Sequence, residues 1–247
     1  MDGKCSFLVG DAVCTPLDVL QDSQYLKLWF ESIGSRIDRF GGARGKVIKY
    51  TSSSFERNIR LMDSVELFSE RLWAKGEQDE PFNCAFSAVL SSATGLLLAA
   101  NSEQVDVTDL LEFVLLYEFF YAKFGYIYLY RESQVYGATY GMGYYSPDEC
   151  HPMFWSRRSE AGKWAKAKRM SLDYLYLRDV FDLNCLGQSK IKAFPEVQRK
   201  VLEDVVGRYG EVEERNGFVC WALSGDAQEA ARDELIYHGL LASHAID

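Results

Sequence analysis

Residues 106–131 read DVTDLLEFVLLYEFFYAKFGYIYLYR, and this stretch decides the fold class. Asp106 or Thr108 can cap a helix whose following residues are apolar almost all round, which is typical of a helix buried in a core. Gly125 ends the helical pattern, and Tyr126–Arg131 then alternates as a Tyr-rich strand. A buried helix followed directly by a strand indicates an α+β protein.

The residues on either side of this stretch extend the pattern. An amphipathic helix is expected over 17–37. Further expected elements follow in chain order: a strand over 46–50, a helix over 55–75, strands over 84–90 and 95–100, the buried helix, a strand over 126–131 and a strand over 135–145. The order β-α-β-β-α-β-β predicts a ferredoxin-like core with one extra strand.

The last sixty residues predict a second small layer. Pro195 opens a helix to Arg208, and a hairpin over 211–223 turns at Asn216-Gly217, the strongest short-range hairpin signal. A helix capped by Asp226 then runs to about residue 238 and ends at Gly239. This α-β-β-α layer follows the ferredoxin-like core.

A break between Pro147 and Pro152 suggests how the chain is organised. We interpret residues 1–150 as an N-terminal α+β subdomain and residues 151–247 as a C-terminal α+β subdomain. The two can also form one continuous domain.

The composition bounds the functional class. The chain has 247 residues, 48% of them hydrophobic, and a formal net charge of −9. Such a charge disfavours non-specific binding to nucleic acid or anionic membranes and suits a basic partner. The most apolar segment, 110–130, carries Glu112, Glu118 and Lys123, and each mid-bilayer charge costs roughly 2.5–3.5 kcal/mol. With no signal peptide apparent at the N-terminus, we predict a cytoplasmic protein without a membrane-bound state.

Motifs for catalysis, metals and nucleotides do not match. The glycine-rich stretch 41–46 has Phe40 and Val47 where a phosphate loop needs Gly and Ser or Thr. Only three His are present, and the side chains of the adjacent Cys150 and His151 diverge. None of the six Cys forms Cys-x-x-Cys, so reduced buried thiols are expected. We therefore predict no catalytic residue, no metal ligand and no cofactor.

Carboxylates are the side chains of this sequence that could form a catalytic site. Three groups could include an acid–base pair: Glu211, Glu213 and Glu214; Asp148 and Glu149; Asp179 and Asp182. Glu211 and Glu213 alternate along one strand face, which is also typical of solvated residues. The sequence alone leaves both interpretations open, with solvation favoured.

A basic segment offers a different function. Trp155 and Trp164 interleave with six basic residues, namely Arg157, Arg158, Lys163, Lys166, Lys168 and Arg169. Such a segment can bind nucleic acid by stacking and charge, or its lysine stems can cover apolar surface. A third alternative is a small-molecule sensor whose aromatic pocket contains Tyr126, Tyr128, Tyr136 and Tyr140.

The second half of the chain resembles the immunity proteins of bacterial secreted toxin systems, including type VI secretion loci. The resemblance rests on the following pieces: Phe124-Gly125-Tyr126 after the buried helix, Tyr140-Gly141, Leu177-Arg178-Asp179-Val180-Phe181 with Asn184 and Leu186, and the strand Gly217–Trp221 with Leu235–Leu241. It implies a rigid inhibitor that covers the active site of a cognate toxin. An acidic inhibitor suits a toxin with a cationic, nucleic-acid-binding surface.

Taken together, these patterns favour a non-enzymatic, protein-binding inhibitor with a protein partner, most simply a cognate toxin. Nucleic acid is not the expected partner of the whole chain. The candidate partner-binding residues are acidic side chains and one aromatic anchor: Glu211, Glu213, Glu214, Asp148, Glu149 and Trp155.

Overall fold

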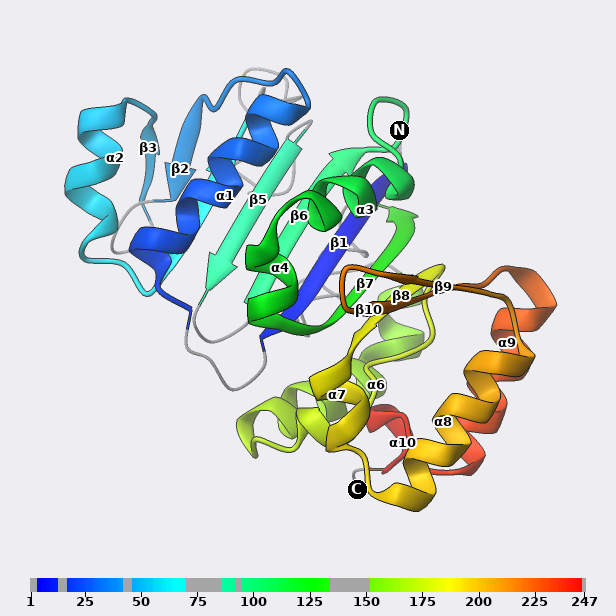
Figure 1. Cartoon of the computed structure of the whole chain (residues 1–247). Coiled ribbons are helices and arrows are strands. Elements are labelled where there is room, and N and C mark those ends of the chain that lie inside the picture. The colour runs from blue at the N-terminus through cyan, green and yellow to red at the C-terminus, as the bar shows by residue number, and fades with distance from the viewer. Residues whose placement is uncertain are drawn as a thin grey trace.

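The computed structural model describes residues 4–12, 17–41, 46–69, 86–91, 95–133 and 152–245. Within these residues one ten-stranded sheet runs through the molecule, with strand order β3-β2-β4-β5-β6-β1-β7-β8-β10-β9 (Figure 1). The strands are β1 Lys4–Ala12, β2 Arg39–Gly41, β3 Val47–Lys49, β4 Ser64–Phe68, β5 Phe86–Ser91, β6 Gly95–Asn101, β7 Phe124–Ser133, β8 Leu183–Gly187, β9 Glu211–Arg215 and β10 Phe218–Ala222.

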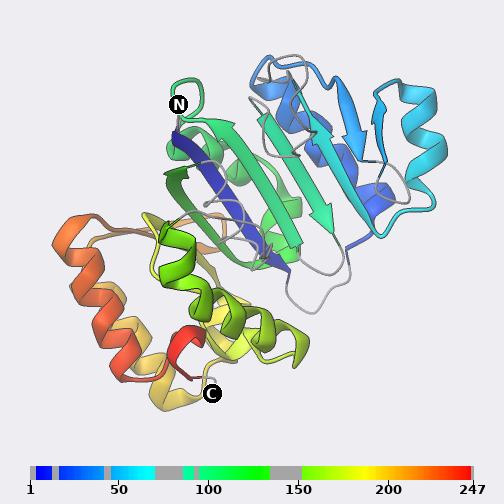
Figure 2. The same cartoon turned by 180° about the vertical axis from the view of Figure 1, so that it is seen from behind.

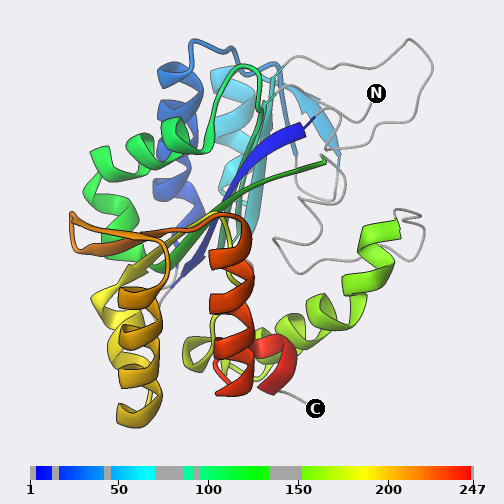
Figure 3. The same cartoon turned by 90° about the vertical axis from the view of Figure 1, so that its right-hand side faces the viewer.

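Helices pack on both faces of this sheet. They are α1 Val19–Ser32, α2 Ser52–Ile59, α3 Val107–Leu116, α4 Glu118–Lys123, α6 Pro152–Arg169, the 3₁₀ turn η2 Asp173–Leu175, α7 Gln188–Ala193, α8 Glu196–Arg208, α9 Gly225–Tyr237 and α10 Ala242–Ala245. One core cluster joins α1–α4 to one face of the sheet, and a second joins α7–α9 to the opposite face. The views from behind and from the side show α6 and α10 next to each other, on the opposite side of the sheet from α1–α4 (Figures 2 and 3).

Strand β1 lies near the middle of the sheet, between β6 and β7, and pairs antiparallel with both. Phe7, Leu8 and Val9 are fully buried; Leu8 belongs to the core cluster on one face, and its two neighbours belong to the cluster on the other. No helix or strand was predicted for these residues. The apolar run was the available signal, because a strand buried on both faces shows no alternation.

The α+β class is confirmed, whereas the ferredoxin-like topology is not. A ferredoxin-like arrangement would place the strand expected over 46–50 between the strands at 95–100 and 126–131. Instead β1 lies between β6 and β7, and β3 lies at one edge of the sheet beside β2. The expected strand over 135–145 lies outside the described residues.

The helix expected over 55–75 is wrong from residue 60 to residue 69, and residues 70–75 lie outside the described residues. Helix α2 ends at Ile59, and β4 begins at Ser64 and pairs with β2 and β5. Val65 and Leu67 are fully buried and flank the partly exposed Glu66, which is the two-residue period of a strand. The same apolar residues also fit a helical stripe, so sheet pairing decided between two matching periods.

The C-terminal α-β-β-α prediction is confirmed almost to the residue by α8, β9, β10 and α9. Asn216 and Gly217 have φ of 48° and 82°, the left-handed pair that a type I′ hairpin turn requires. One detail differs: Ser224, not Asp226, is the N-cap residue of α9.

The buried helix expected over 107–124 is two helices in the structure, α3 and α4. They are separated at Tyr117, which has an extended backbone.

The cysteines that the structure describes, Cys5, Cys185 and Cys220, are free and buried, as expected. Cys185 and Cys220 face each other directly across β8 and β10. The other three lie outside the described residues.

Candidate functional site

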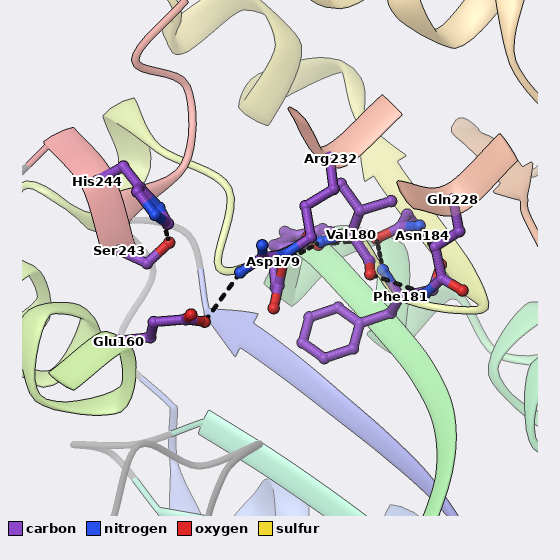
Figure 4. A network of polar contacts seen from close by, with 10 residues as sticks. Glu160, Asp179, Val180, Phe181, Asn184, Gln228, Arg232, Ser243 and His244 are labelled. Carbon is purple, nitrogen blue, oxygen red and sulfur yellow. Dashed lines mark hydrogen bonds and ion pairs between the residues drawn. The ribbon is translucent and has the colours of Figure 1, made fainter. Parts of the chain in front are cut away.

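The segment between η2 and β8 forms a buried polar hub beneath α9 (Figure 4). Its residues 177–181 are all buried, although they form no helix or strand of their own. Asn184 secures the segment: its Nδ2 donates to the Phe181 carbonyl at 2.9 Å, and its Oδ1 accepts from the Phe181 N–H at 3.2 Å. The hydroxyl of Tyr126 on β7 lies 2.9 Å from the same Oδ1. The Leu177–Phe181 motif of the sequence analysis is therefore a packing motif.

Charged side chains connect this hub to two helices. Asp179 Oδ1 accepts from Arg232 Nε of α9 at 2.8 Å and from the Val180 N–H at 2.9 Å. The Arg232 guanidinium continues to Glu160 Oε2 of α6 at 3.0 Å (Figure 4). Asp179 is only 1% exposed. Because these charges point at one another, the arrangement orients helices and offers no open acid–base pair.

A second buried charged cluster lies at the end of β1. Lys168 of α6 forms an ion pair with Asp11 at 2.5 Å, and Lys190 Nζ donates to the carbonyls of Asp173 and Tyr176, each at 2.6 Å. Burial lowers the pKa of Lys190 to about 8, and burial also raises the pKa of Asp173. The cluster joins β1, α6, η2 and α7, and no sequence motif predicted it.

The structure places some of the residues on which the two alternative functions rest. Trp164, expected to stack bases, is fully buried beneath the cationic groups of Lys168 and Arg178. Tyr126 and Tyr128, expected to line an aromatic pocket, are both buried in the core of the sheet. Their phenol pKa values are raised well above the ordinary range by that burial. Tyr136 and Tyr140 lie outside the described residues.

The acidic residues Glu211, Glu213 and Glu214 are brought together on β9, which forms one edge of the sheet. All three are exposed. Glu213 lies opposite Cys220, whose side chain belongs to the core cluster on the α3 side. Glu214 lies opposite Val219, which packs with the α8 side. The hairpin therefore presents Glu211 and Glu213 on one face and Glu214 on the other.

The tip of the hairpin is held against α3. Arg215 donates through both terminal nitrogens to the Glu112 carboxylate, at 2.6 and 2.9 Å, and this contact lowers the pKa of Glu112. Asn216 Nδ2 donates to the Leu115 carbonyl at 2.7 Å. These contacts attach the end of the edge strand to a helix about one hundred positions earlier in the chain.

An apolar groove of about 350 Å³ runs beneath the hairpin on the α8 side. Residues of β8, β10, α7 and α8 line it, together with Gly210 and Val212: Leu186, Ile191, Leu202, Glu203, Val206, Gly207 and Val219. Val212 is 46% exposed, so the groove reaches the surface at the edge strand. Val212 was not predicted to be a surface residue, although its place between two glutamates was the available signal.

A wider hollow of about 670 Å³ lies between α1, α2 and α4. Asp22 is buried in its wall, and burial raises its pKa. The Asp22 carboxylate accepts the N–H of Asp18 at 2.8 Å and lies 3.9 Å from Lys123 Nζ. These contacts fix the start of α1 and satisfy the carboxylate within the protein.

Three other predicted partner-binding residues are not placed by the structure. Asp148 and Glu149 lie outside the described residues. Trp155 belongs to α6, but its side chain is likewise outside what is described. Within the described part of the chain, no group of three His, Cys, Asp or Glu is arranged to hold a metal ion. None of the helices described there is both long and apolar enough to cross a membrane.

Comparison with known proteins gives a likeness in fold. No protein-family model matches the sequence, and no curated protein matches it. Among solved structures, the Pseudomonas aeruginosa T6SS protein PA0821 is similar, with a TM-score of 0.50 and 12% sequence identity. The likeness covers 98% of this chain and 74% of that protein. At this identity the comparison establishes a shared fold.

Proposed function

We propose that this chain is an immunity-type inhibitor that binds a secreted bacterial toxin and covers its active site without chemistry of its own. The observation that carries the proposal is the fold likeness to a T6SS protein over 98% of the chain. The toxin-binding role and the type VI context of this chain are both parts of the proposal.

The geometry of the surface agrees with such a role. The acidic strand β9 is exposed, and the Arg215–Glu112 contact joins the tip of its hairpin to α3. A rigid, pre-formed surface loses less conformational entropy on binding, and its negative charge steers a basic partner toward it. By contrast, the charged groups of α6, α9 and the hub form ion pairs with one another within the protein.

Co-expression tests the proposal. The protein encoded beside this chain is expressed in a bacterial host with and without the chain, and growth is followed. Growth inhibition by the neighbouring protein that the chain relieves, together with an equimolar complex on size-exclusion chromatography, supports an immunity role. A toxic neighbour that remains toxic in the presence of the folded chain would contradict it.

A further inference from the structure

The outer edge of β9 carries backbone N–H and C=O groups that point away from β10. Within the described part of the chain, these groups pair with no other strand. In a hairpin with a two-residue turn, the residues next to the turn form a hydrogen-bonded pair, and bonded pairs then alternate along the strands. Arg215, Glu213 and Glu211 therefore bond to β10, and the N–H and C=O of Val212 and Glu214 point outward.

The groove beneath this edge provides a place for a side chain. Val212 directs its side chain to the α8 face, where Leu202, Val206 and Gly207 line the apolar hollow of about 350 Å³. A side chain at the position beside Val212 in an added strand would point the same way. An aliphatic residue there would lie over the groove.

Charge defines the chemistry of the occupant. Glu211 and Glu213 lie on the opposite face of β9, at the positions beside which the alternate residues of an added strand would be placed. Basic side chains there would meet two carboxylates. A second copy of this chain is a poor occupant, because antiparallel pairing of two β9 strands would place glutamates against glutamates.

We propose that β9 is a docking edge for an extended segment of the partner protein in which basic and aliphatic residues alternate. The inference rests on the proposed function for the identity of the partner. The segment pairs with the outward groups of Val212 and Glu214, places an aliphatic side chain over the groove and sets basic side chains beside Glu211 and Glu213. This is recognition by strand addition.

Three variants isolate the parts of this edge. Val212→Pro removes the outward N–H and leaves the bonds to β10, and proline is tolerated on an edge strand at such a position. Gly207→Leu fills the groove from α8, where an added Cβ meets no atom within 4 Å. The double change Glu211→Gln and Glu213→Gln removes the charge. Gly162→Leu, at an exposed glycine of α6 where an added Cβ also meets no atom within 4 Å, and Glu229→Gln are the matched controls away from this edge, and urea midpoints verify that each variant folds.

The first probe is an acetylated and amidated peptide of alternating Lys and Val, titrated into the full chain and followed by NMR. The inference predicts saturable binding that shifts residues 211–215, weakens about tenfold in Val212→Pro and Gly207→Leu, and is unchanged in the controls. The charge variant should weaken binding and reduce its salt dependence. Absence of binding to the wild type, equal affinity for Val212→Pro, equal binding of a Glu–Val peptide, or a β9-dependent dimer of the chain would each overturn it.

A second arm separates this inference from the proposed function. If the neighbouring toxin is inhibited equally by wild type, Val212→Pro and Gly207→Leu, docking at β9 is refuted while the immunity role stands. If the wild type binds the Lys–Val peptide at β9 but does not inhibit the toxin, the docking edge is supported and the immunity role fails.

Discussion

Arg215 at the tip of the β9–β10 hairpin and Glu112 on α3 are 103 positions apart in the chain and form a bidentate ion pair. The pair joins the last strands of the sheet to a helix from the first half of the sequence. It therefore sets where the acidic edge strand lies relative to the rest of the molecule.

Removing the arginine should be visible at its partner. Hydrogen bonding to Arg215 holds the pKa of Glu112 below its usual range. In Arg215→Gln the Glu112 pKa should rise toward the ordinary glutamate value, as read from its side-chain carboxyl shift in an NMR pH titration. An unchanged Glu112 pKa would show that the two groups are not paired in solution. Glu229, on the exposed face of α9, is the reference carboxyl.

The polar hub should be much more sensitive to substitution than the surface beside it. Asp179→Ala leaves the partly buried Arg232 without one carboxylate and the Val180 N–H without its acceptor, and should lower the free energy of unfolding by about 3 kcal/mol. Asp233→Ala, on the exposed face of the same helix, should change it by less than about 0.5 kcal/mol. Urea denaturation of both variants measures the difference. Equal stabilities would mean that the hub does not hold α9.

Two glycines close together in sequence should respond in opposite directions. Gly210 has φ of 75°, and an added Cβ would lie 2.2 Å from the Ala222 carbonyl oxygen. Gly210→Ala should therefore cost more than about 2 kcal/mol, since both backbone strain and displacement of β10 are involved. Gly207 lies in α8 with open space around it, so Gly207→Ala should stabilise the fold by about 0.5–1 kcal/mol. Thermal unfolding that ranks the two variants the other way would contradict this geometry.

Lys190 should make stability depend on pH in the alkaline range. Its pKa is about 8 in the folded protein, against 10.5 for a free lysine, because burial penalises the charged form more than Asp11 and Asp173 favour it. Between these two values the unfolded chain binds more protons, so the contribution of Lys190 to folding free energy becomes more favourable as pH rises from 8 to 10.5. The change is about 3 kcal/mol.

The matched variant is Lys190→Met, which keeps the length of the side chain and cannot titrate. The difference in unfolding free energy between wild type and Lys190→Met, measured by urea denaturation from pH 7 to 10.5, should move in favour of wild type as pH rises. A difference that stays constant over this range would show that burial does not lower the pKa of Lys190.

Local signals predicted the C-terminal layer well, because Pro195, Asn216-Gly217 and Gly239 each impose a backbone geometry that tertiary contacts do not override. They failed where two periods fit the same residues, as for Val65 and Leu67, and where a strand is buried on both faces, as for Phe7 to Val9. The order of strands could not be derived, since β1 pairs with β6 and β7 from distant parts of the chain.

The candidate surface was predicted in part. Glu211, Glu213 and Glu214 were identified from their charges, and the structure places them on an exposed edge strand. Which face each occupies depends on the register between β9 and β10, and the groove beside Val212 depends on how α8 packs. Neither is visible from the spacing of residues along the chain.

The central claim is that the chain acts by binding a toxin and not by turnover. Titration of the purified neighbouring toxin with the chain, with the toxin's own activity as the readout, tests this most directly. Inhibition that is complete at one chain per toxin molecule and does not increase with incubation time is the predicted result. Inhibition that proceeds to completion with a tenth of that amount, or the absence of inhibition at any ratio, would contradict the claim.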